Sequence, residues 1–500
     1  MYHPFRLSNV GCITAIECPN ETEREKIASP RKHFMNICKK TSLVACLVIF
    51  LVTTSCSVSF AAPQESPPAA QANQSPVAPA RELPSNEPGS AAGKDQKPAM
   101  QSMEKGSSQK ALDWAQWRGP NRTGVLPKQD WPDTLLGKLE RKWSIEMGPS
   151  YSGPLVVGDH VYSTETVDKK WEVTRCFHRS DGKEVWSSRW EGAMTVPFFA
   201  KANGSWIRAT PAFDDGRLYV VGIRDMLKCL DAKTGKELWT IDFAKQFNKN
   251  IPAFGAVTSP MIDGDFLYTQ AASAFFKIKK ESGEVVWTTL NSGDNMMSGG
   301  SFSSPVIAKI NGQRQAIVAT RTTLAGVELD KGDVIWEQPI KTYRGMNILT
   351  PIVSNNQVFI SAYNGSTQMF QIEPGDSKMQ PSEMWSNGAK AYMSTPVVVD
   401  DHAYMFLQNQ RFSCVNLKSG EETYRTSERF GKYASMIVSG KKILALDEDG
   451  TLMLLNANPE KFELIDKIKL SGDSWAHLAI SGDEIIIREL NALTSYQWKK

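Results

Sequence analysis

The stretch ATPAFDDGRLYVVGIRDMLKCLDAKTGKELW, which runs from Ala209 to Trp239, decides the fold. Its alternation of apolar and polar residues indicates short strands, separated by turns around Gly216 and Gly235. The first three strands are expected at residues 210–213, 218–223 and 226–231, and the fourth ends on Trp239. The stretch therefore predicts a four-stranded antiparallel meander, which is too small to bury both of its faces alone.

This unit recurs along the chain with a spacing of roughly 40 to 50 residues, the range of propeller blades. A turn glycine pairs with an aromatic residue in Gly182/Trp186, Gly235/Trp239, Gly283/Trp287, Gly332/Trp336, Gly375/Trp385 and Gly420/Tyr424. Six copies open with a small residue and proline, as in Thr210-Pro211, and the openings at Ser435 and Ala476 lack the proline. Eight openings predict an all-β, eight-bladed β-propeller with four-stranded antiparallel blades.

The two ends of the repeat region each hold part of a blade. Residues 139–145 have the pattern of a fourth strand with its tryptophan, whereas residues 475–498 supply only the other three strands. We expect these two parts to form one blade, so that an N-terminal strand closes the ring and removes both open edges.

The tryptophan near the end of each blade is expected to pack blade against blade, because one indole buries about 150–250 Å². These residues are Trp143, Trp186, Trp239, Trp287, Trp336 and Trp385. Cys176, Cys229 and Cys414 share one position, before the turn that ends the third strand. Because they fall in different blades, without a C-x-x-C motif, we expect buried free thiols and neither a disulfide nor a metal site.

The loops that lead into the first strands converge on one mouth of the ring and are rich in aromatic and basic residues. Because interface hot spots are enriched in these types, we expect a binding site here. Its candidate residues are Tyr151, Trp206, Arg208, Phe302, Arg344, Tyr392, Tyr433 and Trp475. Phe254, Asn347 and Lys390 lie in the same loops. The alternative is that these side chains only fill the narrow centre of the ring, and His477 is expected to be packed in the same way.

The sequence offers little support for catalysis or nucleic-acid binding. It has no Ser-His-Asp order, no H-E-x-x-H motif and no phosphate-binding glycine loop. Its net charge is only +3, and the repeats have no long basic run.

The front of the chain differs from the repeats. The apolar run Leu43–Thr53 follows Lys39-Lys40 and precedes a small-x-small site near Ala61, which is typical of an export signal. We predict a signal-peptide region at 1–61, with a true start at Met35 as one option, a disordered Pro/Ala/Ser/Gln-rich linker at 62–112 and the propeller at 113–500. A retained N-terminal anchor and a lipid anchor at Cys56 are the alternatives. The mature chain is expected to carry no membrane span.

The motifs Thr210-Pro211, Asp215-Gly216-Arg217-Leu218-Tyr219 and 230–239 together resemble the pyrroloquinoline-quinone-like (PQQ-like) repeat of eight-bladed propellers. The resemblance covers about Trp117 to Trp498, and Trp114 to Gly124 is similar to the front of secreted members described from planctomycete-type bacteria.

This family resemblance implies one of two activities. One branch comprises quinoprotein alcohol and sugar dehydrogenases, which hold pyrroloquinoline quinone and calcium. The other is represented by the propeller lipoprotein of the outer-membrane β-barrel assembly machine, a docking scaffold without a cofactor. Because the sequence lacks a Cys-Cys pair and an acidic cluster for a hard cation, we expect an exported, non-catalytic scaffold in the periplasm or cell envelope, with membrane association as one option. We expect it to be a monomer that binds an envelope or secreted protein or peptide, and the dehydrogenase is the alternative.

Overall fold

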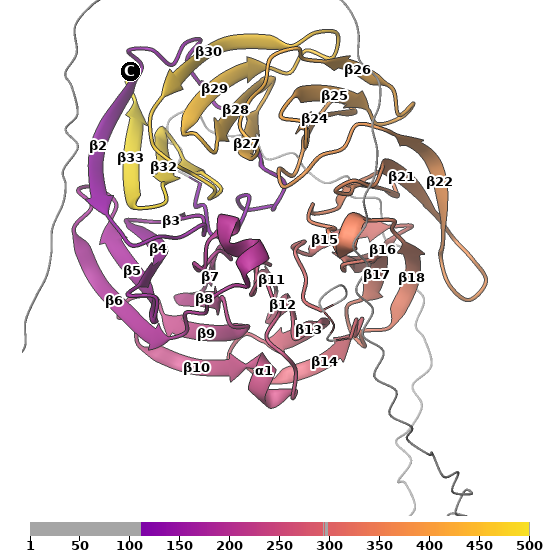
Figure 1. The fold of residues 1–500 in the computed structure, drawn as a ribbon, viewed down its shortest axis with the longest axis horizontal. Coiled ribbons are helices and arrows are strands. Elements are labelled where there is room, and N and C mark those ends of the chain that lie inside the picture. Colours follow the sequence, from indigo (N-terminus) through magenta and orange to yellow (C-terminus); the bar gives the residue numbers. More distant parts are fainter. Residues whose placement is uncertain (1–111, 294, 296–298, 500) are drawn as a thin grey trace, which may run out of the picture. The chain divides into compact units, whose positions relative to one another are not determined.

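The computed structural model describes residues 112–293, 295 and 299–499 as a ring of eight sheets around a central axis (Figure 1). Seven sheets are four-stranded, and a short extra strand makes the eighth five-stranded. First strands such as β7 and β11 lie near the axis, and fourth strands such as β10 and β14 lie at the rim (Figure 1). The predicted eight-bladed propeller is therefore confirmed. The predicted leader at 1–61 and nearly all of the predicted linker lie outside the described residues.

Blades 1 to 4 follow one another in chain order. Their strands are β3 (Leu155–Val157), β4 (His160–Val167), β5 (Trp171–His178) and β6 (Glu184–Glu191); β7 (Ala212–Asp214), β8 (Arg217–Gly222), β9 (Met226–Asp231) and β10 (Glu237–Asp242); β11 (Met261–Asp263), β12 (Phe266–Ala271), β13 (Ala274–Lys279) and β14 (Val285–Thr289); β15 (Val306–Ile310), β16 (Gln313–Ala319), β17 (Thr323–Glu328) and β18 (Val334–Pro339).

Blades 5 to 8 complete the ring. Their strands are β19 (Ile352–Ser354), β20 (Gln357–Ser361), β21 (Thr367–Glu373) and β22 (Gln380–Asn387); β23 (Val397–Val399), β24 (His402–Phe406), β25 (Phe412–Asn416) and β26 (Glu422–Arg425); β27 (Ala434–Ser439), β28 (Lys442–Asp447), β29 (Thr451–Asn456) and β30 (Glu463–Lys469), with β1 (Val125–Leu126) beside β27; β31 (Ala479–Ser481), β32 (Glu484–Arg488) and β33 (Ala492–Trp498), with β2 (Leu139–Glu146).

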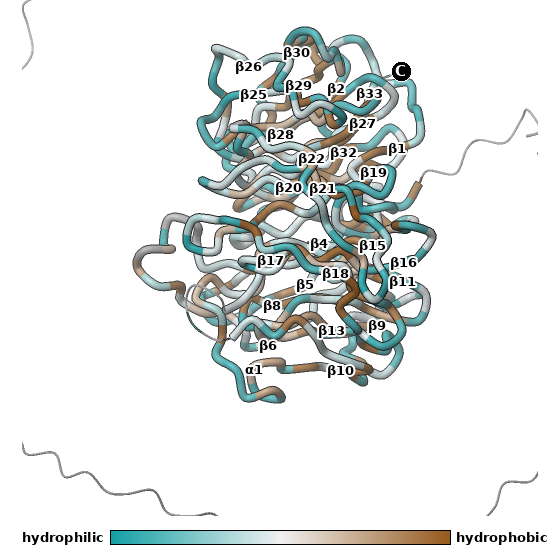
Figure 2. Tube along the Cα trace, turned by 90° about the vertical axis from the view of Figure 1, so that its right-hand side faces the viewer, coloured by the Kyte–Doolittle hydropathy of each residue, from teal (hydrophilic) through white to brown (hydrophobic). Residues whose placement is uncertain are grey.

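Helices are short in the described chain: η1 (Phe198–Asn203), α1 (Phe243–Gln246) and η2 (Tyr343–Gly345). Within residues 112–499, apart from the gaps named above, no helix is long and apolar enough to cross a membrane. In the side view of Figure 2, turns and loops at the surface are mostly hydrophilic, and hydrophobic segments occur along the strands.

An N-terminal strand closes the ring, as predicted. Strand β2 pairs antiparallel with β33, so that Trp143 lies opposite Ser495 and Ile145 lies opposite Leu493. Each end of the repeat region thereby covers the other's open edge.

Tryptophans of the fourth strands contact the next blade. Trp186 donates its indole N–H to the carbonyl of Ala232 at 3.0 Å, and its ring lies where a side chain at Gly235 would project. Gly235 therefore supplies both a positive φ of 72° and room for the indole. Equivalent indole donations run from Trp143 to Arg179, Trp239 to Lys280, Trp287 to Leu329 and Trp385 to Leu417.

Trp336 differs from the other blade tryptophans. It donates to Oε1 of Gln315 in its own blade at 2.6 Å, yet it remains buried against Val358 and Ile360 of blade 5. The turn between β21 and β22 carries the insertion at 374–379, and the tight glycine turn of the other blades is replaced there.

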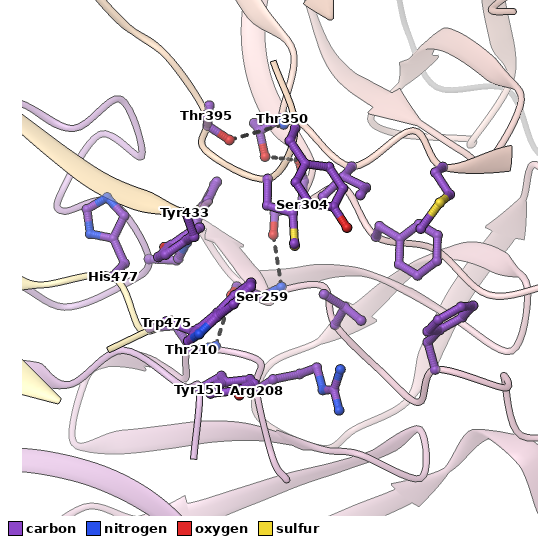
Figure 3. A pocket seen from close by; sticks show the side chains of 18 residues that line it. Tyr151, Arg208, Thr210, Ser259, Ser304, Thr350, Thr395, Tyr433, Trp475 and His477 are labelled. Atoms are coloured by element: carbon purple, nitrogen blue, oxygen red, sulfur yellow. Dashed lines mark hydrogen bonds between the residues drawn. The ribbon is translucent and has the colours of Figure 1, made fainter. Parts of the chain in front are cut away.

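The small residue before each opening proline links neighbouring blades around the axis. The amide of Gly153 donates to Oγ1 of Thr210, that of Thr210 to Oγ of Ser259, and that of Ser259 to Oγ of Ser304, each at 3.0 Å. Figure 3 shows this hydroxyl belt continuing to Thr395. The proline that follows has no N–H, so it leaves no donor unpaired at the crowded axis.

The three repeat cysteines are buried and free, as expected. Burial raises the pKa of Cys176 to about 12 and that of Cys229 to about 11, so both stay protonated at neutral pH.

Candidate binding site at the mouth of the ring

Residues 113–126, which we call the plug, close one end of the axis. Trp114 forms a bridge with Val156 in blade 1, and the amide of Phe213 in blade 2 donates to the carbonyl of Ala115 at 2.8 Å. Strand β1 then pairs in parallel with β27 of blade 7. The plug therefore crosses the axis near the turns that join first and second strands.

Two buried arginines fix the plug to blades on different sides of the axis. Arg122 donates to the carbonyl of Pro260 at 2.9 Å and to that of Ser259 at 3.2 Å, both in blade 3. Arg118 donates to the carbonyl of Pro396 in blade 6 at 2.7 Å. Burial lowers the pKa of Arg118 to about 10 and that of Arg122 to about 9, and the charge of Arg118 contributes to the latter. Both remain protonated at neutral pH.

Trp117 lies between these arginines and the open end of the axis. Its ring centroid is 5.6 Å from the guanidinium carbon of Arg118 and 5.5 Å from that of Arg122, within cation–π range. His477 contacts the same indole edge-on at 6.2 Å. Burial, with the nearby Arg118 charge, lowers the pKa of His477 to about 3, so the imidazole is neutral. It is packed, as the sequence suggested.

The open end holds a cavity of about 180 Å³, with the half-buried Trp117 among its lining residues. All eight first-strand loops contribute to it. Its lining is Trp117, Tyr151, Arg208, Thr210, Phe254, Val257, Ser259, Phe302, Ser304, Met346, Ile348, Thr350, Tyr392, Met393, Thr395, Tyr433, Trp475 and His477.

Stacked aromatic rings form one wall of this cavity. Tyr433 stacks on Trp475 with centroids 5.8 Å apart, and Trp475 packs against Tyr151 at 5.6 Å. Tyr151 contacts Trp206 edge-on at 6.4 Å. On another side, Phe302 lies under the guanidinium of Arg321 at 4.6 Å. These rings are held by one another, so the wall is fixed before any ligand arrives.

Arg208 is the one cation among the lining residues. Its Nε donates to the carbonyl of Trp206 at 3.2 Å, and one terminal nitrogen donates to the carbonyl of Gly204 at 2.9 Å. The guanidinium extends toward the other lining residues in Figure 3. Burial lowers the pKa of Arg208 to about 10, so it stays charged at neutral pH.

Six of the eight residues expected at the mouth line the cavity. Trp206 stands behind Tyr151, and Arg344 is exposed on η2, where its guanidinium lies over Tyr343 at 5.2 Å. The six that the structure brings together are Tyr151, Arg208, Phe302, Tyr392, Tyr433 and Trp475.

Sequence reasoning missed the contribution of the plug. Trp117 precedes the repeats, so its place at the axis follows only from the tertiary fold. Thr210 and Ser259 could have been recognised in the sequence as residues near the axis, because each precedes the proline that opens a blade. That pattern alone does not predict the hydrogen bonds of the hydroxyl belt.

The lining residues do not fit a calcium-bound quinone. None of them is an aspartate or glutamate, and a calcium ion requires several oxygen ligands, usually including carboxylates. In the described part of the chain, no three His, Cys, Asp or Glu residues are grouped as metal ligands. Glu448 and Asp473 line, with Trp475, a separate depression at blades 7 and 8, and Glu448 accepts a hydrogen bond from the amide of Tyr433 at 2.9 Å. The cavity therefore suits recognition through rings, hydroxyls and one cation.

The repeats, the ring and its plugged axis define an eight-bladed propeller of the PQQ-like repeat class. The family model described as outer membrane protein assembly factor BamB matches residues 169–426, more than half of the 500 residues, and the chain belongs to this family.

Individual relatives are distant in sequence. The chain is 24% identical to the outer membrane protein assembly factor BamB of Moranella endobia (strain PCIT) over 338 residues, covering 56% of this chain and 82% of that protein. It is 23% identical to the protein of that name from Escherichia coli (strain K12) over 333 residues, covering 55% of this chain and 81% of the relative.

Solved structures share the fold. BamB from Moraxella catarrhalis superposes with a TM-score of 0.53 at 15% identity, covering 72% of this chain and 98% of that one. A europium-containing methanol dehydrogenase superposes with a TM-score of 0.56 at 12% identity, covering 77% and 98%. At such identities the likeness concerns the fold alone, since one fold hosts both binding proteins and enzymes.

Proposed function

We propose that this chain is an exported, non-catalytic docking scaffold of the cell envelope that binds a protein or peptide partner at the mouth of its ring. The observation that carries the proposal is the cavity itself, which is walled by Tyr and Trp rings, contains Arg208 and has no carboxylate in its lining. Membership of a family described as an assembly factor supports a scaffold.

Site-specific photo-crosslinking in the source cells tests this proposal. A photoreactive phenylalanine analogue at Tyr392, which lines the cavity, should crosslink to a discrete envelope protein. The matched control places it at Leu238, which is 45% exposed on the outer strand β10. A partner that crosslinks equally from both positions, or only from Leu238, would place docking on the blade edges instead.

The same site predicts a binding defect in a simple variant. Trp475→Ala removes the ring between Tyr433 and Tyr151, so it should weaken partner binding by roughly 1–4 kcal/mol if Trp475 is a hot spot. Titration calorimetry with the crosslinked partner measures the loss.

A quinoprotein dehydrogenase is the second candidate, favoured by the indole of Trp117 in the cavity lining and by the shared fold. Titration of the purified protein with pyrroloquinoline quinone and calcium separates the two. Dye-linked oxidation of alcohols or sugars that requires both additions would replace the scaffold with the enzyme.

A further inference from the structure

Arg208 is a charged group without a counter-ion in a largely apolar cavity. Both of its hydrogen bonds go to carbonyls of its own loop, those of Gly204 and Trp206, and among the described residues no carboxylate lies within ion-pair distance of it. A partly desolvated cation is costly unless an anion pairs with it. The cavity therefore lacks one component, which is a negative charge beside Arg208.

The cavity beside Arg208 has room for one aromatic side chain. Its volume of about 180 Å³ is comparable to the roughly 150 Å³ of an apolar cavity that binds benzene. Aromatic or aliphatic side chains from Trp117, Phe254, Phe302, Met346 and Ile348 surround it.

A series of tyrosines extends the site from the cavity to the surface. Tyr392 lines the cavity, Tyr363 contacts it with centroids 4.7 Å apart, and Tyr343 contacts Tyr363 at 6.1 Å. Tyr343 is 46% exposed, and Arg344 covers one face of its ring. A ligand confined to the cavity would leave these rings unused, whereas a peptide that leaves the cavity along them would cover them.

Charged residues around the mouth favour one orientation of a bound acidic peptide. Arg344 lies at the outer end of the tyrosine series, in the loop before blade 5, whereas Glu448 and Asp473 lie with Trp475 at blades 7 and 8. An acidic group is repelled by the latter pair and attracted to Arg208.

We propose that the mouth recognises an extended peptide segment of its partner in which an aromatic residue stands within two positions of an aspartate or glutamate. The ring occupies the cavity, the carboxylate pairs with Arg208, and the flanking residues lie along Tyr392, Tyr363 and Tyr343. This inference rests on the proposed docking function and adds the chemistry of the bound segment.

A random linear peptide library displayed on phage, panned against the immobilised full ring, tests the proposal. Wild-type protein should enrich sequences that combine a Phe, Tyr or Trp with a nearby Asp or Glu. Arg208→Gln should keep the aromatic preference and lose the acidic one, whereas the control Arg141→Gln, at an exposed arginine on the outer strand β2, should keep both. Wild-type selection without acidic residues, or the same acidic preference in Arg208→Gln, would overturn it.

A double-mutant cycle with synthetic peptides measures the ion pair. Changing Glu to Gln in a selected peptide should weaken its binding to wild type by roughly tenfold to hundredfold, as expected for a hydrogen bond to a charged group. On Arg208→Gln the same peptide change should matter less than about threefold. Equal losses on the two proteins would show that the carboxylate binds elsewhere.

A second measurement does not depend on how well Arg208→Gln folds. A benzophenone at the ring position of the selected peptide should label the mouth loops of wild-type protein, at residues 206–210 or 346–351. Labelling of the blade edges, or pyrroloquinoline quinone binding where no peptide is selected, would contradict the inference. If Tyr392 crosslinks a cellular partner while the peptide selection fails, only this inference falls; if both fail, the docking function falls with it.

Discussion

The two ends of the propeller axis use arginine in different ways. At the plugged end, Arg118 and Arg122 are buried and donate to backbone carbonyls of blades 6 and 3. At the open end, Arg208 is half-buried and donates only to carbonyls of its own loop. The hydrogen bonds of the first pair therefore hold the ring together, whereas those of Arg208 hold one side chain in position. We infer that one end serves stability and the other recognition.

Removing the plugged end altogether should have the largest effect. Deletion of residues 113–145 removes the plug and nearly all of β2, and thereby exposes β33 and the inner edge of β27. We expect no soluble monomer, as judged by size-exclusion chromatography of the expressed protein. A soluble, monomeric product would mean that the ring closes without its N-terminal strand.

A single change in the plug should have the next largest effect. Arg122→Met fills similar space but leaves the carbonyls of Ser259 and Pro260 without their buried donor. We expect the free energy of unfolding to fall by about 2–4 kcal/mol, measured by urea denaturation. Arg344→Met, at an exposed site, is the control and should change it by less than about 0.5 kcal/mol. Equal stability of the two variants would remove the structural role given to the plug.

The seam between blades 1 and 2 should make stability depend on pH. Glu172 is fully buried and accepts hydrogen bonds from the amide of Ile223 at 2.7 Å and the indole of Trp190 at 3.0 Å. Burial raises the pKa of this carboxyl from 4.5 to about 7, against the opposing effect of those donors.

The sign of the effect follows from proton counting. Between about pH 4.5 and 7 the folded state keeps the Glu172 proton that the unfolded state has released, so raising the pH through this window destabilises the fold. The expected loss is on the order of 1–3 kcal/mol. Glu172→Gln should flatten this part of the pH profile of the melting temperature. An unchanged slope in the variant would show that Glu172 does not titrate in this range.

Much of the ring follows from local sequence. The alternation in 209–239 and its repeats predict the blades, because strands depend on short-range periodicity. The pairing of the strand around Trp143 with 493–498 follows from a count, since each end of the repeat region holds only part of a blade. Strand boundaries follow less closely from local sequence. The strand expected at 210–213 begins at Ala212, since the amide of Thr210 donates to Ser259 in the hydroxyl belt and Pro211 has no N–H to donate.

The site was only partly predictable. Loop position placed Tyr151, Tyr392 and Trp475 correctly at the mouth, but it could not separate Arg208, which faces the cavity, from Arg344, which faces solvent. Arg344 lies inside η2 with a positive φ of 52°, a local backbone conformation that loop position does not predict. Trp117 reaches the cavity because the plug crosses the axis, and the repeat pattern of the sequence does not predict that crossing.

The smallest effect on stability is expected from a change at the open end of the axis. Arg208→Gln removes a half-buried charge whose two hydrogen bonds span only Gly204 to Arg208, so no other blade loses a donor. Loss of an unpaired cation from an apolar site also relieves a desolvation cost, which offsets the lost bonds. We therefore expect Arg208→Gln to change the free energy of unfolding by less than about 1 kcal/mol. The matched variant Arg122→Gln should lower the free energy of unfolding by clearly more. Urea denaturation of both variants under one set of conditions measures the difference. If Arg208→Gln destabilises the ring as much as Arg122→Gln does, the mouth arginine is a structural element like those of the plug, and the division between the two ends is wrong.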